Sequence, residues 1–319
     1  MIDITLDNLR EASAALTGVA TRTPLLPLAL EPDLGARGEV RLKAEHLQPI
    51  GAFKIRGAWT AVRRLPPEAQ RRGVVTSSSG NHGLGIAYAA NRLGVRAVVV
   101  MPESAAGVKI EGVRRLGAEV VLAGRIRGPE QAIAAQQFVD TQGLAMIPPF
   151  DHPDVIAGQG TCALEILDQW PEVRTIIVPV GGGGLLGGTC AAVRATGARV
   201  RIVGAEPAGI PKLSVAAAAG RPTTLPPGSS LADGLLTPSI GDITWPLIRE
   251  MLDSVVSVTD EQIRGAMRWL AAHGLRVEPS GAVSTAAALS DPERLMADAT
   301  ALLCSGGNVD ASRYDELVA

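Results

Sequence analysis

The sequence predicts an α/β protein in which parallel sheets carry helices on both faces, a doubly wound arrangement. Short β-branched segments alternate with helical segments along most of the 319 residues, and this repetition is typical of parallel sheets. The strand-like segments are apolar nearly throughout, as expected of strands that are buried on both faces. A chain of this length can form one large domain or two closely packed ones.

The residue pattern indicates where the strands and helices lie along the chain. Strands, marked by short apolar runs, are expected at residues 73–76, 95–101, 118–122, 175–180, 200–205, 255–258 and 299–303. Helices are expected among them at residues 84–93, 108–116, 130–141, 161–170 and 260–273. Prolines interrupt the pattern near residues 148–153. We therefore expect a large domain formed by residues 1–65 and 149–319, and a small mobile domain formed by residues 73–147.

The composition argues against a nucleic-acid partner. Thirty Lys and Arg residues against 32 Asp and Glu residues leave a formal net charge of −2, so no basic surface for phosphates is expected. Aromatic residues make up only 3% of the chain, which leaves few side chains on which bases can stack.

Neither a membrane helix nor export is expected. The uncharged segment at residues 175–193 is long enough to span a bilayer, but four consecutive glycines interrupt it. The N-terminal segment is acidic and lacks the apolar core of a signal peptide. Three widely spaced cysteines lie in apolar stretches, which predicts buried free thiols and a cytoplasmic protein; they are Cys162, Cys190 and Cys304.

Four consecutive glycines follow the predicted strand TIIVPV and open a helix. Because Gly181, Gly182, Gly183 and Gly184 lack Cβ atoms, their N–H groups can approach an anion closely, and the helix N-terminus adds a positive dipole. We therefore predict a phosphate cradle here, with a plain tight turn as the alternative.

This segment alone leaves the kind of phosphate open. Gly182, Gly184 and Gly187 satisfy G-x-G-x-x-G, and Glu206 ends the next predicted strand, as in an NAD-dependent Rossmann oxidoreductase. The fingerprint lies in the middle of the chain and not at its first strand, so other segments have to decide between the cofactors.

A lysine lies among apolar and glycine residues in LKAEHLQPIGAFKIRG. Lys54 stands between Phe53 and Ile55, and apolar surroundings lower the pKa of a lysine because desolvation disfavours the ammonium. The free amine can then form a Schiff base. The alternative is a solvated lysine at the start of a helix.

Two more predicted strands end in polar loops. SSSGNHGLG at residues 77–85 brings hydroxyls and an amide to a helix N-terminus, which suits a carboxylate or phenolate oxygen or, alternatively, only caps the helix. LCSGGNVD at residues 303–310 is a further strand followed by two glycines. Since parallel strands end at a common edge, we expect these loops and the glycine cradle to face one crevice.

Taken together, these segments resemble pyridoxal phosphate (PLP) enzymes of fold type II, and more narrowly the threonine/serine dehydratase and serine racemase group. The resemblance rests on FKIRGA, SSGNHG, VPVGGGG, EPSG and CSGGNVD, with PFDHPDVIAGQGT and LADGL in support. It runs from about residue 23 to residue 310. It implies two doubly wound parallel-sheet domains with PLP in the cleft between them, and it makes an NAD enzyme a distant alternative.

The resemblance also implies roles for single residues. Lys54 would bind PLP and later move a proton at the α-carbon, and Ser79 would be a catalytic residue on the opposite ring face. The implied cofactor contacts are Phe53, Lys54, Asn81 at the 3′ oxygen, Gly181 to Gly184 at the phosphate, Leu185, and Ser305 at the pyridine nitrogen. The implied substrate contacts are Ser78, Ser79, Gly80, Asn81, His82 and Gly234.

The serine at position 305 bears on the reaction. A hydroxyl does not stabilise a protonated ring nitrogen as a carboxylate does, so β-elimination or racemisation is favoured over transamination. Ser79 permits racemisation, which needs a proton donor opposite Lys54. Phe150 stands where racemases of the group tend to have Asn, as it does in threonine dehydratases, and we therefore favour dehydration.

One departure from the group concerns metal binding. Many relatives bind Mg²⁺ or Mn²⁺ through a Glu and an Asp six residues apart; Glu206 matches the first position, but Lys212 stands at the second. We expect no divalent ion here and a Lys212 ammonium paired with Glu206. The alternative is that Lys212 points into solvent.

We therefore predict a PLP-dependent ammonia-lyase that converts L-threonine, L-serine or both to a 2-oxo acid and ammonia. Serine racemase, hydroxyaspartate dehydratase, phenylserine dehydratase and a non-catalytic PLP-binding protein are the alternatives. Which of Arg56, Arg125 and Arg127 reaches the substrate is left open. A homodimer or homotetramer is typical of the group, and the short segment after NVD leads us to expect no isoleucine feedback.

Overall fold

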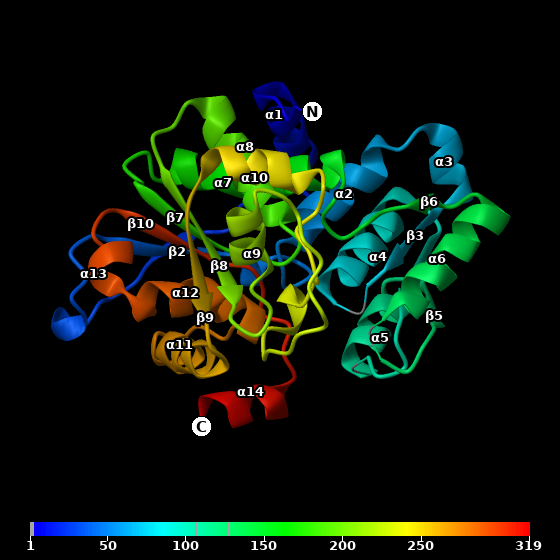
Figure 1. Ribbon diagram of the computed structural model, residues 1–319. Coiled ribbons are helices and arrows are strands. Elements are labelled where there is room, and N and C mark those ends of the chain that lie inside the picture. The colour runs from blue at the N-terminus through cyan, green and yellow to red at the C-terminus, as the bar shows by residue number, and fades with distance from the viewer. Residues whose placement is uncertain (1–2, 79, 106, 127) are drawn as a thin grey trace.

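The computed structural model describes residues 3–78, 80–105, 107–126 and 128–319. Two sheets, one parallel and one parallel except for its first strand, lie side by side in it, each flanked by helices (Figure 1). This arrangement confirms the predicted α/β fold class. In the described part of the chain, none of the helices is both long enough and apolar enough to cross a membrane.

The larger sheet has six strands and combines segments from both ends of the chain. Its order is β1 (Leu25–Pro27), β2 (Val40–Ala44), β10 (Thr300–Cys304), β7 (Thr175–Pro179), β8 (Arg201–Pro207) and β9 (Leu252–Val258). All neighbouring strands are parallel except β1 and β2. Thr300 of β10 pairs with both Val40 and Thr175, so the central strands end at a common edge.

Helices cover both faces of this sheet. On one side lie α11 (Asp260–Ala272), α12 (Pro279–Ser290), α13 (Pro292–Leu295) and α14 (Ala311–Val318) (Figure 1). On the other lie α1 (Leu6–Ala15), α7 (Pro153–Gln169), α8 (Gly184–Thr196) and α10 (Thr244–Met251). Ile177 packs with α11 and α12, whereas its neighbour Ile176 packs with α7 and α8, so alternate strand residues fill two separate cores.

The smaller sheet has four parallel strands, in the order β5 (Glu119–Leu122), β4 (Ala97–Met101), β3 (Val74–Ser77) and β6 (Ala145–Met146). Its helices are α3 (Pro67–Arg72), α4 (Asn81–Leu93), α5 (Gly107–Arg115) and α6 (Pro129–Gln142). Helix α2 (Lys54–Arg64) packs against both α4 and α7 and thereby joins the two sheet units.

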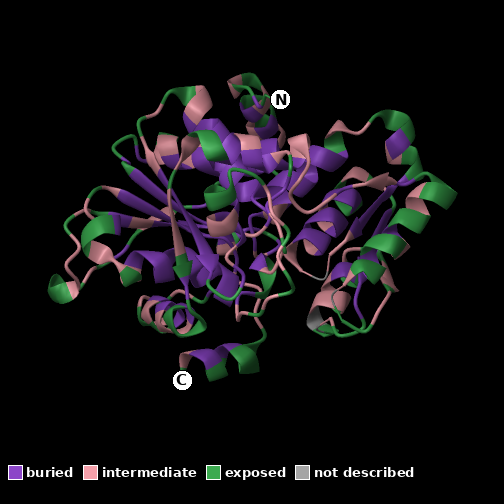
Figure 2. Ribbon diagram, viewed as in Figure 1, coloured by how far each residue is buried: buried purple, intermediate pink, exposed green. Residues whose placement is uncertain are grey.

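The remaining elements are short. They are α9 (Lys212–Ala219), which packs against β8 and β9, and the single-turn 3₁₀ helices η1 (Pro32–Leu34), η2 (Glu45–Leu47) and η3 (Asp233–Leu235). Figure 2 shows that buried residues concentrate in the strands and in the helix faces that cover them.

Several features differ from the sequence prediction. Strand β2 is absent from the sequence prediction, because the charged Lys43 interrupts its apolar pattern. In the structure Lys43 is fully buried, and its ammonium donates to Glu165 at 2.6 Å. Helix α7 begins at Pro153 and not at residue 161, since glycines and β-branched residues weaken the helical pattern of its first half. Burial on both faces is wrong for the edge strands β5 and β9, whose residues are partly exposed.

Candidate active site

One cavity of about 110 Å³ collects the loops that follow β3, β7 and β10, together with the start of α2. The predicted site residues that line it are Phe53, Lys54, Ser78, Gly80, Asn81, His82, Gly181, Gly182, Gly183, Gly184, Leu185, Gly234 and Ser305. Ser79 lies outside the described residues. Pro149, Phe150, Thr237 and Glu278 also line the cavity, although the sequence analysis assigns no contact to them.

Lys54 is the first residue of α2, and the loop after β10 holds the chain just before it. The N–H of Phe53 donates to the carbonyl of Ser305 at 3.1 Å, and Ala52 forms a β-bridge with Gly306. The Lys54 ammonium donates to the carbonyl of Pro149 at 2.6 Å and lies 5.1 Å from the centre of the Phe53 ring. The amine is therefore positioned by segments that are far apart in sequence.

The glycine loop has the shape of an anion cradle. Gly183 has a φ of 96°, and a Cβ atom on it would lie 2.8 Å from the Thr244 hydroxyl. A Cβ atom on Gly182 would overlap the ring of Phe150. Helix α8 begins at Gly184, so the N–H groups of its first turn have no partner within the helix. These features fit a phosphate group.

Asn81 connects the smaller sheet unit to the larger one. Its amide nitrogen donates to Glu278 at 2.7 Å, and its amide oxygen accepts from the Asn308 side chain at 2.8 Å. Burial, and then the charge of Asp233, raises the pKa of Glu278 to about 8, so this carboxyl is largely protonated at neutral pH. The only sequence signal for Glu278 is its place in the EPSG motif.

His82 is a neutral imidazole. Burial, and then the charge of Lys54, lowers its pKa to about 3. Its Nε2 lies 3.1 Å from the carbonyl of Ile147, which can only accept, so we assign the proton to Nε2. Nδ1 is then an acceptor that has no hydrogen-bond partner among the described residues.

Ser305 presents a neutral hydroxyl at the cavity wall. The side chain is buried, and its Oγ donates to the carbonyl of Ser280 at 3.2 Å. The same Ser280 accepts the N–H of Gly234 through its own hydroxyl at 3.0 Å. The loop after β10 and the LADGL turn are therefore held by one residue of α12.

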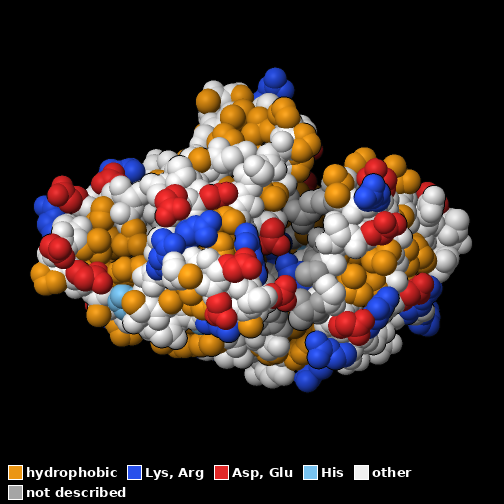
Figure 3. Space-filling view, turned by 90° about the horizontal axis from the view of Figure 1, so that it is seen from below, with side chains coloured by type: hydrophobic (Ala, Val, Ile, Leu, Met, Phe, Trp, Pro, Cys, Tyr) orange, Lys and Arg blue, Asp and Glu red, His pale blue; other side chains and the backbone are white. Residues whose placement is uncertain are grey.

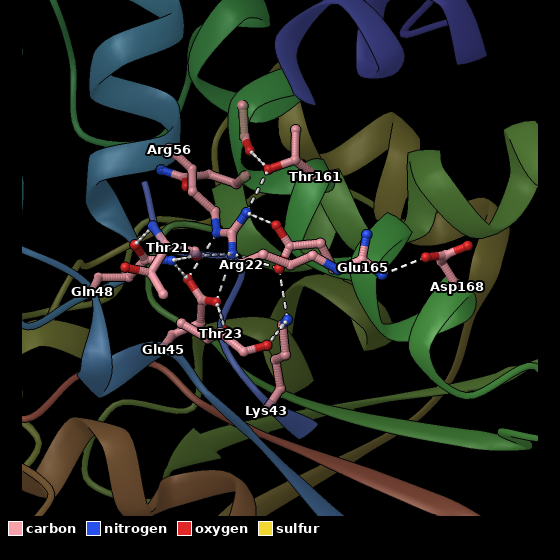
Figure 4. A network of polar contacts seen from close by, with 12 residues as sticks. Thr21, Arg22, Thr23, Lys43, Glu45, Gln48, Arg56, Thr161, Glu165 and Asp168 are labelled. Carbon is pink, nitrogen blue, oxygen red and sulfur yellow. Dashed lines mark hydrogen bonds and ion pairs between the residues drawn. The ribbon is translucent and has the colours of Figure 1, made fainter. Parts of the chain in front are cut away.

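Arg56 does not line the cavity. Figure 4 shows its guanidinium within a buried network, where it donates to Glu45 at 2.8 Å and to Glu165 at 2.7 Å. Lys43 donates to Oε2 of Glu165, which also accepts from Arg56, so two cations and two anions balance. Arg125 is also absent from the cavity wall, and Arg127 lies outside the described residues. Lys54 is thus the one Lys or Arg among the described lining residues.

A wider cleft of about 930 Å³ meets the cavity at Glu278. The ion pair between Lys109 of α5 and Asp233 of η3, at 3.0 Å, crosses it. In Figure 3 acidic and basic side chains gather around the hollow between the two parts of the molecule. The cleft and the cavity therefore adjoin at Glu278.

Glu206 and Lys212 lie outside the cavity wall, and both are fully buried. The Lys212 ammonium is 3.9 Å from the Glu206 carboxylate, so the alternative in which Lys212 points into solvent is wrong. A buried ammonium in this position does not fit a divalent cation, because two positive charges would share one carboxylate.

Comparisons with known proteins agree with this geometry. A family model described as pyridoxal-phosphate dependent enzyme matches residues 16–306. The L-threonine ammonia-lyase of Thermotoga maritima is 37% identical over 316 residues, which cover 99% of this chain and 78% of that protein. The L-threo-3-hydroxyaspartate ammonia-lyase of Saccharomyces cerevisiae is 37% identical over 320 residues, which cover 100% of this chain and 97% of that protein.

A solved structure gives the same result. Maize serine racemase matches with a TM-score of 0.93 and 36% sequence identity, covering 99% of this chain and 97% of that chain. The resemblance seen in the sequence and PLP as the cofactor are thereby confirmed, and the NAD alternative is discarded. The chain belongs to the family of pyridoxal-phosphate dependent enzymes.

Proposed function

We propose that this protein is an ammonia-lyase that converts L-threonine, L-serine or both to a 2-oxo acid and ammonia. The observation that carries the proposal is the make-up of the cavity. Among the described residues, Lys54, the glycine cradle and the N-terminus of α4 line it together. They supply an amine, a phosphate site and a carboxylate site, which are the groups that a PLP enzyme needs for an amino acid.

Each residue has a role in this proposal. PLP, when bound, withdraws electrons from the α-carbon of an amino acid. Lys54 holds the cofactor and accepts the α-proton through its amine. The first-turn N–H groups of α8 bind the phosphate, and the N-terminus of α4 binds the substrate carboxylate. Ser305, which the family resemblance places at the ring nitrogen, would offer that nitrogen a neutral hydroxyl and no charged partner, which favours loss of the β-hydroxyl group.

The cavity favours a substrate with a small uncharged side chain. Hydroxyaspartate carries a second carboxylate, and apart from Lys54 the described lining residues offer it no Lys or Arg. Neutral His82 supplies no positive charge either. We therefore rank threonine and serine above hydroxyaspartate as substrates.

The test begins with the visible spectrum of the purified protein and with borohydride reduction. We expect a PLP absorbance band and a reduced adduct that maps to Lys54. A Lys54→Ala variant is the control and should give no adduct. A wild-type protein that stays colourless with added PLP, or an adduct on another lysine, would contradict the site assignment.

Assays with single amino acids then identify the reaction. With L-threonine or L-serine as the substrate, oxo acid and ammonia should form in equal amounts. L-threo-3-hydroxyaspartate and phenylserine should react at least about tenfold more slowly, the effect of roughly 1.4 kcal/mol in the barrier. Formation of D-serine without oxo acid would instead identify a racemase.

A further inference from the structure

A fully buried ion pair lies behind the cofactor cavity. Glu206 is near the end of β8 and Lys212 begins α9, and neither side chain is exposed. The Glu206 carboxylate accepts from the N–H groups of Leu213 and Ser214 at 2.7 and 2.8 Å, and from the Ser214 hydroxyl at 2.7 Å. These bonds hold the carboxylate at the first turn of α9.

Oxygen atoms from three segments surround the Lys212 ammonium. It donates to the carbonyl of Leu235 at 2.9 Å and approaches the carbonyl of Ile210 at 3.5 Å. A carboxylate oxygen of Glu206 lies 3.9 Å away. Backbone carbonyls and a carboxylate around one positive charge are the ligands that a bound hard cation takes in proteins.

The carbonyl of Leu235 links this cation to the cavity wall. Leu235 and Gly234 belong to η3, and both line the cavity. A Cβ atom on Gly181 would lie 3.4 Å from the carbonyl oxygen of Gly234, so η3 packs directly against the first glycine of the cradle. The position of η3 therefore sets one wall of the phosphate site.

We infer that the Lys212 ammonium is an internal cation that fixes η3 against the glycine cradle and takes the place of a separate metal ion. Without it, the Glu206 charge and the Leu235 carbonyl would stay buried with one partner fewer, and η3 would lose the hydrogen bond that joins it to α9. The inference concerns PLP binding and stability, so it does not depend on which amino acid is the substrate.

Lys212→Met tests whether the charge is needed, because methionine has a similar length and no ammonium. We expect the PLP dissociation constant, measured by absorbance titration, to rise on the order of tenfold, as for the loss of one buried hydrogen bond to a charged group. The melting temperature of the holoenzyme should also fall. A variant that binds PLP as tightly as the wild type would overturn the inference.

Lys212→Asp and Lys212→Asn form a matched pair that differs in charge alone. In Lys212→Asp, the new carboxylate would join the Glu206 carboxylate and the two backbone carbonyls as possible ligands of a cation. Added Mg²⁺ or Ca²⁺ should therefore raise the melting temperature of this holoenzyme to a plateau, and it should not do so for Lys212→Asn. The wild type should respond neither to EDTA nor to these ions. If EDTA releases PLP from the wild type and Mg²⁺ restores it, Lys212 does not replace a metal ion and the inference is wrong. The wild-type and Lys212→Met measurements decide the question even if the aspartate variant does not fold.

Discussion

Glu278 is the residue at which the cavity and the wider cleft meet, and its ionisation should be visible in the stability of the protein. Burial raises its pKa from 4.5 to about 8. The pKa of Glu278 is higher in the folded state than in the unfolded state. The stabilisation that the Glu278 carboxyl provides is therefore complete below about pH 4.5 and is lost as the pH rises to about 8. As the pH rises through this range, the free energy of unfolding of Glu278→Gln should increase relative to that of the wild type by on the order of a few kcal/mol. Unfolding experiments at several pH values measure this difference.

Glu68 provides the control for this prediction, since it is exposed on α3. Glu68→Gln should leave the pH dependence of stability as it is in the wild type. If the Glu278→Gln protein loses stability with rising pH as steeply as the wild type does, Glu278 is not the group that titrates.

The glycines of the cradle and of helix α8, which follows it, are not equivalent in the space around them. A Cβ atom on Gly182 would overlap the Phe150 ring, whereas one on Gly187 would lie 3.6 Å from Thr244, an ordinary contact. Gly182→Ala should therefore weaken PLP binding by about tenfold or more, and Gly187→Ala should bind PLP as the wild type does. Absorbance titration with PLP measures both constants. Equal losses in the two variants would show that shape at Gly182 is not the cause.

At the scale of elements, helix α2 carries both Lys54 and the buried network around Arg56. Arg56 ties α2 to η2 through Glu45 and to α7 through Glu165, and its side chain is 1% exposed. Removing one member leaves buried charges without a partner. Arg56→Met should lower the free energy of unfolding by about 3–5 kcal/mol in urea titrations.

A surface ion pair beside this network provides the comparison. Arg22 pairs with Asp168 of α7, and their side chains are 55% and 70% exposed (Figure 4). Because water screens such a pair, Arg22→Met should lower the free energy of unfolding by no more than about 1 kcal/mol. Similar losses in the two variants would mean that the buried network does not stabilise α2 beyond an ordinary surface pair.

At the scale of the whole molecule, the Lys109–Asp233 ion pair joins the two sheet units across the cleft. We propose that it favours the closed arrangement of the two units around the substrate. Lys109→Met should then raise KM for the amino acid several-fold with little change in kcat, because the closed state loses a contact. Steady-state kinetics at low and high salt measure the effect.

Salt should reproduce the effect in the wild type, since the Asp233 side chain is 59% exposed and the pair is open to screening. Arg96→Met is the control, because the Arg96–Glu119 pair lies within the smaller unit. An unchanged KM in Lys109→Met, or an equal rise in Arg96→Met, would contradict the role of the cleft-crossing pair.

The parts of the fold and of the site that can be predicted from the sequence are those marked by a pattern of a few adjacent residues. Apolar runs predict β4 and β7, and the glycine run predicts the cradle, because strand burial and backbone freedom are properties of a few adjacent residues. The prediction that strand-end loops face one crevice holds for the loops of Asn81 and Ser305, although β3 and β10 belong to different sheets. The family resemblance, and not the strand ends, predicts that Lys54 joins them.

The sequence by itself therefore determined the α/β class, the PLP family and most of the residues that line the cavity. Only the tertiary structure decided the state of the buried charges: Arg56 serves a network and not the substrate, and Lys212 faces Glu206 and Leu235. The physical reason is that the free energy of a buried charge depends on its partners, and the partner of Arg56 on α7 lies 109 residues away in the chain.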